Sequence, residues 1–318
     1  MKGIVTKNTG SQYVVQGSDN ELYNCKIKGN FRIKGIRTTN PVAIGDHVTI
    51  EPPKGGNSDS DTPLYYITEI EPRKNYIIRR ASNLSKESHI IAANLDQSML
   101  VMALKDPATS LTFVDRFLAT AEAYGIPTRI IINKIDNLDS EELELANAIK
   151  TLYEQIGYKV IFTSAKTGEG IEQVREMLEG KVTLFSGNSG VGKTSLINEL
   201  IPSLNLRTAV VSATHHTGMH TTTFSEMHRL PNGNGCIIDT PGVKGFGTID
   251  FDVAEVAHYF PEIFEISHDC KYNNCTHTHE PGCAVRAAVE DSRISQSRYA
   301  GYLSILEDSA SDKYRKPF

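Results

Sequence analysis

The chain opens with short runs of alternating apolar and polar residues, separated by Gly, Asn and Pro. These runs occupy residues 2–8, 11–17, 21–29, 46–52 and 64–72. Alternation with a period of two is typical of strands that bury one face. About five short strands at this spacing, with no long helical pattern between them, predict a small β-barrel over residues 1–72. The oligonucleotide-binding (OB) barrel is the natural candidate.

The pattern changes after about residue 80, where buried strand-like runs alternate with amphipathic helical segments. Strands are expected at residues 95–104, 127–133, 158–164 and 181–187, and helices at 111–125, 139–157, 170–180 and 192–201. Such alternation predicts a parallel sheet covered by helices on both faces. A hairpin-like stretch ending in "NGCIIDTPG" follows, and the pattern is helical again from about residue 250. We therefore expect an α/β domain over residues 73–248 and a helical domain over 249–318.

Composition narrows the class of protein. The chain of 318 residues is 39% hydrophobic and 22% charged, as in ordinary soluble globular proteins. No apolar run approaches the roughly 18 residues that span a bilayer, and no signal sequence opens the chain, so a cytoplasmic location is expected. Five cysteines, an odd number, argue against a disulfide framework. Residues 1–80 carry a net charge of +4 and the remainder −9, which suggests separate modules with separate partners.

The stretch "GNSGVGKTS" at residues 187–195 matches the phosphate-binding pattern G-x-x-x-x-G-K-[ST], between an expected strand and an expected helix. Its glycines let successive backbone N–H groups point at phosphate oxygens, and the helix adds its positive end. Lys193 would reach the β- and γ-phosphates, and the Thr194 hydroxyl would coordinate Mg²⁺. The remaining candidate phosphate contacts are Gly187, Asn188, Ser189, Gly190, Val191, Gly192 and Ser195.

The stretch "IIDTPG" supplies a second part of this site. An expected strand delivers Asp239 to its end, where the carboxylate can hold the hydration shell of Mg²⁺. Gly242 can then offer its backbone N–H to the γ-phosphate. The D-x-x-G pattern alone is common in turns and is weak evidence. At this distance after a phosphate loop, it strongly indicates a nucleotide site.

Two tetrapeptides at strand ends, "NKID" and "TSAK", predict which base is bound. The candidate guanine contacts are Asn133, Lys134, Asp136, Ser164, Ala165 and Lys166. The Asp136 carboxylate can accept two hydrogen bonds from guanine, and the Ala165 N–H can meet the guanine O6. Adenine offers no such pair and would leave buried polar groups unpaired. Either tetrapeptide alone could be a solvated turn. The pair favours GTP and disfavours a P-loop kinase or ATPase.

A Cys/His cluster follows in the helical region. The pattern C-x4-C-x-H-x5-C comprises Cys270, Cys275, His277 and Cys283. Three thiolates and one imidazole form a closed tetrahedral shell of the structural-zinc type, with no open position for catalysis. His268 and His279 are rival donors on spacing alone.

The order of the motifs is reversed from the usual one, because the guanine loops precede the phosphate loop and D-x-x-G. With a barrel before and a Cys/His cluster after it, the chain resembles the bacterial ribosome small-subunit-dependent GTPase A family. The resemblance implies a circularly permuted α/β P-loop GTPase domain, which binds GTP and GDP with Mg²⁺, and one structural Zn²⁺ with His277 as the nitrogen ligand. It also implies a monomeric enzyme that binds the 30S ribosomal subunit, is stimulated by it and assists its late maturation.

The family's switch pattern G-x-H-T-T is matched by "GMHTTT". Thr222 or Thr223 would bind Mg²⁺ and the γ-phosphate. Val243 stands where Ras-like enzymes place the glutamine that orients the attacking water, so His220 is our candidate for that role. The alternative is a loop histidine without a catalytic role. Many family members carry a basic residue where this chain has Met219, which leaves the local contacts of the loop open.

A basic segment in the barrel is the candidate RNA surface. Residues 26–37 contain no acid, and the candidate contacts are Lys26, Lys28, Phe31, Arg32, Lys34 and Arg37. Alternating cations around an aromatic ring can bind phosphates and stack a base, although such charge is also common on solvated surfaces. With the resemblance, contact with 16S rRNA is expected. An rRNA-binding adaptor that uses GTP as a clamp, with negligible turnover, is the alternative. The chain runs from D-x-x-G into the zinc-bearing region, so the γ-phosphate switch could steer that region directly.

Overall fold

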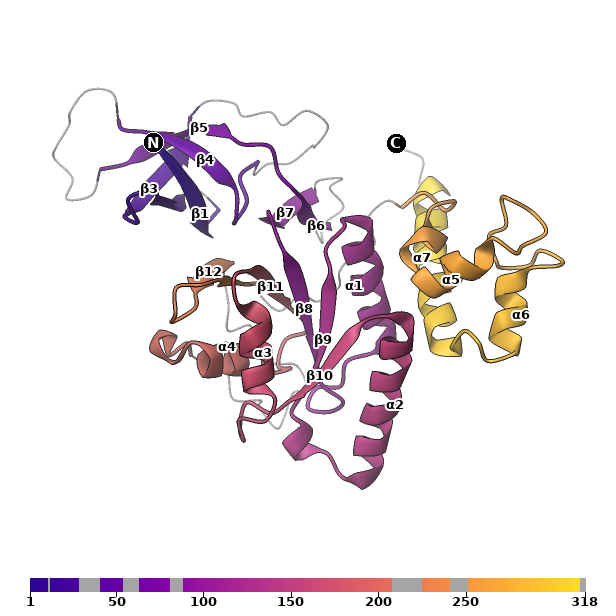
Figure 1. Ribbon diagram of the computed structural model, residues 1–318. Coiled ribbons are helices and arrows are strands. Elements are labelled where there is room, and N and C mark those ends of the chain that lie inside the picture. Colours follow the sequence, from indigo (N-terminus) through magenta and orange to yellow (C-terminus); the bar gives the residue numbers. More distant parts are fainter. Residues whose placement is uncertain are drawn as a thin grey trace.

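The computed structural model describes residues 1–10, 12–28, 41–53, 63–80, 88–207, 225–240 and 251–314. Figure 1 shows a small barrel at one end, an α/β domain in the middle and a helical unit beside α1. In the described part of the chain, no helix is both long and apolar enough to cross a membrane.

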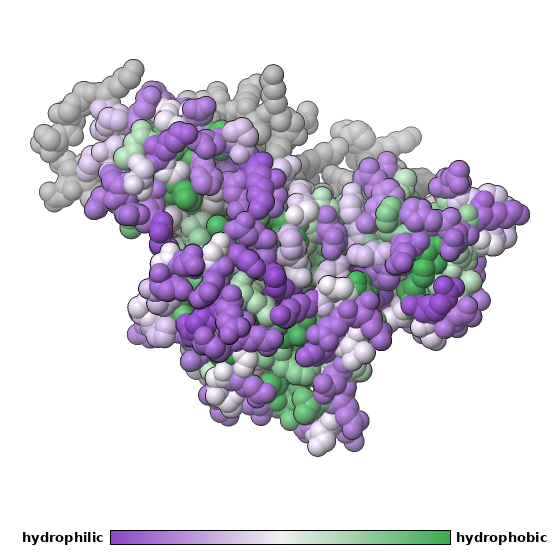
Figure 2. Space-filling view, viewed as in Figure 1, coloured by the Kyte–Doolittle hydropathy of each residue, from purple (hydrophilic) through white to green (hydrophobic). Residues whose placement is uncertain are grey.

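The N-terminal strands close into a barrel, as predicted. They are β1 (Lys2–Asn8), β2 (Tyr13–Gly17), β3 (Leu22–Ile27), β4 (His47–Glu51) and β5 (Tyr65–Ile70). Their order is β1-β2-β3-β5-β4, and β4 pairs back with β1. Alternate residues point inward and form a separate core of Val5, Tyr13, Val15, Cys25, Val42, Val48, Ile50 and Ile67. Figure 2 shows polar side chains covering much of the barrel's visible face.

The α/β domain contains a sheet in the order β10-β9-β8-β11-β13-β12. Its strands are β8 (Gln97–Met102), β9 (Thr128–Asn133), β10 (Lys159–Thr163), β11 (Val182–Ser186), β12 (Glu226–Arg229) and β13 (Cys236–Asp239). All adjacent pairs are parallel except β12 with β13. The carboxyl ends of the parallel strands therefore meet at one edge, where the predicted nucleotide motifs lie.

Helices cover both faces of this sheet, as the sequence predicts. On one face, α1 (Leu111–Ala123) and α2 (Ser140–Ile156) pack with Leu100 and Ile130. On the other, α3 (Ile171–Leu178) and α4 (Lys193–Leu200) pack with Met99 and Ile131. Neighbouring residues of a strand point to opposite faces, so β8, β9, β10, β11 and β13 contribute to both cores. Short 3-10 turns lie at Ile135–Asn137 and Pro202–Leu204.

A two-stranded hairpin, which the sequence analysis did not assign, connects the barrel to this domain. It comprises β6 (Tyr76–Arg80) and β7 (Ser88–Ala93), which form a separate two-stranded sheet, and Ala92 of β7 also forms an isolated parallel bridge with Ile44. Ile77 and Ala92 are buried in the same core as α1. The Tyr76 ring lies 5.2 Å from the Tyr124 ring at the end of α1. The hairpin thus packs against α1 and contributes to the same core.

The C-terminal region is helical, as predicted, with the 3-10 turn η3 (Val256–Tyr259) and helices α5 (Pro261–Ser267), α6 (Ala284–Glu290) and α7 (Gln296–Tyr314). Pro261 begins a new helix, so the continuous pattern around it is divided in two. Phe260, Ile263 and Tyr302 are buried in a further core, which also contains Ala119 of α1. The helical unit is therefore packed directly onto α1, as Figure 1 shows.

Candidate nucleotide site and metal centre

The phosphate-loop sequence forms a tight loop between β11 and α4. Gly187, Gly190 and Gly192 have φ angles of +146°, +84° and +96°, which L side chains rarely adopt. A Cβ on Gly187 would lie 2.1 Å from the Val101 carbonyl oxygen, and one on Gly192 would lie 2.3 Å from Asn133 Nδ2. The glycines are therefore needed for conformation and for close approach to the ends of β8 and β9.

Lys193 lies inside this loop, with only 7% of its surface exposed. Its Nζ donates to the carbonyl oxygens of Gly187 and Asn188, at 2.6 and 2.8 Å. Burial lowers the pKa of Lys193 to about 8, although the Asp239 carboxylate favours the charged form. The ammonium group is thus held within the fold of the loop and lies in the field of the carboxylate at the end of β13.

The "NKID" segment joins the phosphate loop to the loop after β8. Asn133, 1% exposed, donates through Nδ2 to the Val191 carbonyl oxygen at 2.9 Å. Lys134 has a left-handed φ of +65°, and its Nζ donates to the Gly190 carbonyl oxygen at 2.7 Å and to that of Asp106. Burial lowers the pKa of Lys134. Both side chains therefore support the shape of the phosphate loop.

The Asp136 carboxylate is oriented by residues of "TSAK". Ser164 Oγ donates to Asp136 Oδ1 at 2.6 Å and accepts from the Thr167 N–H at 3.1 Å. Lys166 Nζ lies 3.7 Å from Asp136 Oδ2. The adjoining cavity has a volume of 380 Å³ and is lined by Asn133, Lys134, Asp136, Asn137, Ala165, Lys166, Gly192 and Ser195. The structure thus brings the two predicted guanine tetrapeptides and the phosphate loop to one cavity.

Sequence reasoning missed two contributors to this arrangement. Thr163 Oγ1 donates to Asn133 Oδ1 at 3.0 Å and fixes the orientation of that amide. Asp106 accepts from Lys134 through its backbone carbonyl. Thr163 is the first residue of "TSAK", but its side chain was not among the predicted contacts, and Asp106 belongs to none of the motifs, so local spacing gave no signal for these two hydrogen bonds.

The predicted magnesium ligands lie only partly within the described chain. Asp239 is 2% exposed at the end of β13, and Thr194 lies in the first turn of α4. Their carboxylate and hydroxyl oxygens are hard donors of the kind Mg²⁺ prefers. The next residue, Thr240, donates through Oγ1 to the Phe185 carbonyl oxygen at 3.1 Å and joins β13 to β11. The other predicted residues, His220, Thr222, Thr223 and Gly242, lie outside the described residues.

Four side chains near the C-terminus form a candidate metal centre. The ligand atoms of Cys270, Cys275, His277 and Cys283 all lie within 4.8 Å of one another. His277 Nδ1 is 3.5 Å from Sγ of both Cys270 and Cys283, and those sulfurs are 4.0 Å apart. A tetrahedral ion with Zn–S of about 2.3 Å and Zn–N of about 2.0 Å requires edges of about 3.8 and 3.5 Å. The four donors therefore fit a tetrahedral metal ion.

The rival histidines lie elsewhere. The His268 ring packs edge-on against Phe264, and His279 Nδ1 contacts Thr278 Oγ1 at 2.8 Å. His277 is only 2% exposed and has a left-handed φ of +58°. Its carbonyl oxygen accepts from the Tyr299 hydroxyl at 2.6 Å, so α7 supports the ligand loop.

The basic segment of the barrel is only partly described. Lys26 is exposed on β3, and Lys28 follows that strand. Lys28 Nζ lies 2.8 Å from Glu51 Oε2 of β4, so its charge is balanced by an acid from a strand distant in sequence. The remaining predicted RNA contacts, Phe31, Arg32, Lys34 and Arg37, lie outside the described residues.

Together, these loops define a class of protein. The phosphate loop follows β11, while the guanine tetrapeptides follow β9 and β10, which precede it in the chain but flank the same sheet edge. The fold is therefore that of a guanine-nucleotide-binding P-loop domain with circularly permuted connectivity.

Comparison with known proteins identifies the family. The RsgA GTPase family model matches residues 70–249, and the RsgA N-terminal domain model matches residues 2–58. The chain therefore belongs to the RsgA GTPase family.

Relatives share the whole length of the chain. A protein of Bacteroides fragilis named "Small ribosomal subunit biogenesis GTPase RsgA" is 60% identical over 318 residues, which is 100% of both chains. A Flavobacterium johnsoniae protein of the same name is 48% identical over 96% of this chain and 93% of its own. The crystal structure of YjeQ from Thermotoga maritima has a TM-score of 0.73 at 31% identity, covering 97% of this chain and 98% of that one. YloQ, described as a circularly permuted GTPase, has a TM-score of 0.68 at 30% identity, covering 100% of this chain and 96% of that one.

Proposed function

We propose that the protein hydrolyses GTP in the biogenesis of the small ribosomal subunit, and that it binds the 30S subunit through 16S rRNA and is stimulated by it. The observation that carries the proposal is full-length identity of up to 60% with proteins named for this activity, in a chain that has a guanine-type cavity. The expected setting is the cytoplasm and the expected form a monomer, with domains at residues 1–72, 73–248 and 249–318.

In this proposal the Asp136 carboxylate selects guanine, and Ser164 is the group that positions it. The hydroxyl of Ser164 already donates to one carboxylate oxygen, so the other oxygen and the remaining lone pairs can face the base. The Ala165 N–H meets the guanine O6, and the Lys134 stem lies along the base. Adenine would leave the carboxylate without donors, which penalises ATP.

The phosphate loop and Lys193 stabilise the charge that develops on the transferred phosphoryl group. Thr194 and Asp239, with Thr222 or Thr223, would hold Mg²⁺, which supplies charge neutralisation at the β- and γ-phosphates. His220 would orient the attacking water, because Val243 can neither donate nor accept a hydrogen bond through its side chain.

The Cys/His cluster would hold one structural Zn²⁺. Four protein ligands leave no open coordination position, so the ion would stabilise the loop between α5 and α6 rather than catalyse. The barrel would contact rRNA through Lys26, Lys28, Phe31, Arg32, Lys34 and Arg37, and replacing its basic residues should reduce the salt dependence of binding.

Turnover of GTP with and without isolated 30S subunits tests the proposal. We expect stimulation by the subunit, and GTP but not ATP should displace a fluorescent guanine nucleotide. Negligible turnover in both conditions, with intact GTP and subunit binding, would favour an rRNA-binding adaptor instead. His220→Ala should lose stimulated turnover while keeping nucleotide affinity, and near-normal turnover would remove His220 from the mechanism.

A further inference from the structure

Among the described residues, two contacts between the barrel and the nucleotide domain differ in physical character. The first contact joins the loop before β4 to the end of β7. Arg73, 8% exposed in its side chain, pairs with the buried Asp46 at 2.6 Å. Ala93 N–H donates to the Ile44 carbonyl oxygen at 2.8 Å, and a Cβ on Gly45 would lie 2.2 Å from the Ala93 carbonyl oxygen. This contact is buried and close-packed, so it fixes one side of the barrel.

The second contact joins β1 to β12 and is exposed. Lys7 of β1 lies opposite Glu226 of β12 in an antiparallel pairing, and their side chains form an ion pair at 3.0 Å. Both side chains are more than a third exposed, at 38% and 39%. Arg229 at the other end of β12 donates twice to Gln16 Oε1 of β2, at 3.0 and 2.7 Å. Exposed pairs of this kind are weak and easily broken.

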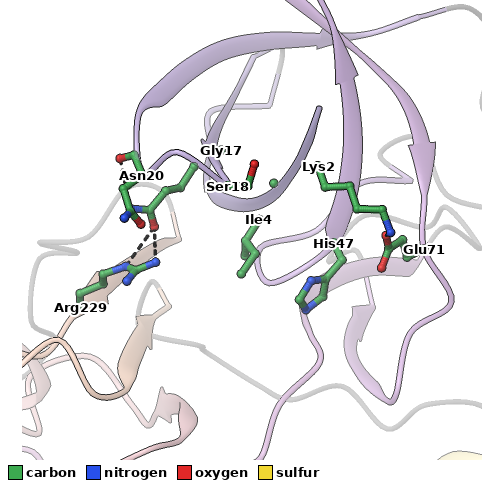
Figure 3. A pocket seen from close by; sticks show the side chains of 10 residues that line it. Lys2, Ile4, Gly17, Ser18, Asn20, His47, Glu71 and Arg229 are labelled. Atoms are coloured by element: carbon green, nitrogen blue, oxygen red, sulfur yellow. Dashed lines mark hydrogen bonds and ion pairs between the residues drawn. The ribbon is translucent and has the colours of Figure 1, made fainter.

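The backbone of β1 is also irregular at this point. Residues 2–4 pair with β4, and the register against β2 shifts between Val5 and Lys7, as in a β-bulge. Bulges redirect a strand and increase its twist. Beside the pairing, a cavity of 310 Å³ is lined by barrel residues and by Arg229, which donates to Gln16 of the barrel (Figure 3). The contact between barrel and β12 is therefore a narrow joint rather than a packed interface.

In the chain, β12 lies close to the two segments that are predicted to contact the γ-phosphate. β12 begins three residues after Thr223 of the G-x-H-T-T segment, and β13, its partner, ends at Asp239 of D-x-x-G. In GTPases these two segments respond to the γ-phosphate. The buried contact, in contrast, involves Arg73, which precedes β6, and Ala93 at the end of β7. Of these two described contacts, the exposed one is thus attached to a strand flanked on both sides by γ-phosphate segments.

We propose that β12 transmits the nucleotide state to the barrel: the Lys7–Glu226 pairing and the Gln16–Arg229 contact form a joint whose closure depends on whether GDP or GTP is bound. The buried contact at Asp46 and Arg73 acts as the fixed side of the joint. The inference rests on the proposed function, because it requires the site to bind both nucleotides.

Hydrogen–deuterium exchange of full-length protein tests this joint without the ribosome. Exchange in peptides covering β1 and β2 is compared between the Mg²⁺ complexes of GDP and a non-hydrolysable GTP analogue. We expect the two exchange rates to differ by about twofold or more, the scale of an exposed ion pair. In Lys7→Glu, which places like charges opposite each other, the ratio should fall to about one. In Lys7→Glu/Glu226→Lys the ratio should return.

Lys2→Ala is the matched control, because Lys2 is also an exposed β1 lysine but pairs with Glu71 at 2.7 Å, within the barrel. It should leave the ratio unchanged. Equal exchange in the two nucleotide states of the wild type, or a difference that persists in Lys7→Glu, would overturn the inference. A fluorescent-nucleotide titration accompanies each sample. If neither nucleotide binds, the proposed function is refuted, and so is the inference that rests on it. If both nucleotides bind normally and exchange is equal, only the proposed joint is refuted.

Discussion

A buried group of charges attaches the helical unit to α1, and it permits a quantitative test. Arg298 of α7, 1% exposed, donates to Asp115 Oδ1 at 2.8 Å and to both carboxylate oxygens of Glu262, at 2.6 and 3.1 Å. The Tyr153 hydroxyl donates to the same Asp115 oxygen at 2.7 Å. Burial raises the pKa of Asp115 to about 6, although Arg298 favours the charged form. The Asp115 carboxylate therefore depends on Arg298 to remain ionised.

Arg298→Met should weaken the attachment of α7 by about 3–5 kcal/mol, because it leaves a fully buried carboxylate without its cation. Native-state hydrogen exchange of α7 amides measures the free energy of this opening. The pH dependence has a defined sign. Since the folded pKa of Asp115 lies above the unfolded value of about 3.9, stability in the wild type should fall as pH rises from about 4 to about 6. In Arg298→Met the pKa of Asp115 should rise further, because the cation that favours the carboxylate is gone. The loss of stability should then continue to higher pH.

Two further variants make this test specific. Asp115→Asn/Arg298→Met removes both charges and keeps an acceptor for Tyr153, so it should be more stable than Arg298→Met alone. Arg116→Met removes another α1–α7 contact, to Ser304 and Asp308, but at a more exposed site, and should cost less than about 1 kcal/mol. A cost below about 1 kcal/mol for Arg298→Met, or a double variant no more stable than the single one, would refute the reasoning.

Three other outcomes follow from named contacts. Gly301→Ala should loosen α7 by about 1–3 kcal/mol in the same exchange assay, because the new Cβ would lie 2.5 Å from Asp115 Oδ2; an unchanged rate would contradict this close contact. Ser164→Ala should weaken GDP binding about five- to tenfold in a fluorescence titration, by removing the hydrogen bond that positions Asp136. Since burial sets the Lys193 pKa near 8, polyphosphate binding should take up a proton above that pH, with affinity falling up to about tenfold per pH unit. Calorimetry in two buffers of different ionisation enthalpy would show no proton uptake if Lys193 were fully charged there.

Local patterns predicted most of the fold because most elements bury one periodic face. The first strand occupies Lys2–Asn8, the same residues as its alternating run, and α1 and α2 lie within their predicted segments. The β6–β7 hairpin was not predicted, since the sequence analysis assigned no element between residues 72 and 95. Its strands form a two-stranded sheet apart from the main sheet, and Ala92 and Ala93 of β7 are buried in succession rather than alternately. Such a unit has a weak periodic signal and is stabilised mainly by tertiary contact with α1.

The candidate site, too, has one part that could be predicted from the sequence and one part that could not. Motif spacing located the phosphate loop, both guanine tetrapeptides and the Cys/His cluster. Each of these motifs is a short local sequence whose residue types and spacing suit one kind of ligand. Contacts between segments that are distant in sequence were not predictable. Glu51 balances Lys28 across the barrel, and the Asp106 carbonyl oxygen accepts from Lys134 across 28 residues. Such pairs depend on how strands are arranged in space, which spacing along one chain does not record.

The order of strands in the sheet shows where the circular permutation attaches the two additional domains. β11, which leads into the phosphate loop, is flanked by β8 on one side and β13 on the other. The chain enters the sheet from the barrel at β8 and continues after β13 toward the helical unit. The additional domains are therefore connected to the two strands that flank the phosphate-loop strand. In space, the barrel contacts β12 and the helical unit packs on α1, the helix that follows β8. Each additional domain is therefore connected through the backbone to one flanking strand and packs near the other. The helical unit follows β13 in the chain but packs on α1, which follows β8. The barrel precedes β8 in the chain but pairs with β12, the partner of β13. Each end of the chain is thereby linked to both sides of the phosphate loop, once through the backbone and once through packing.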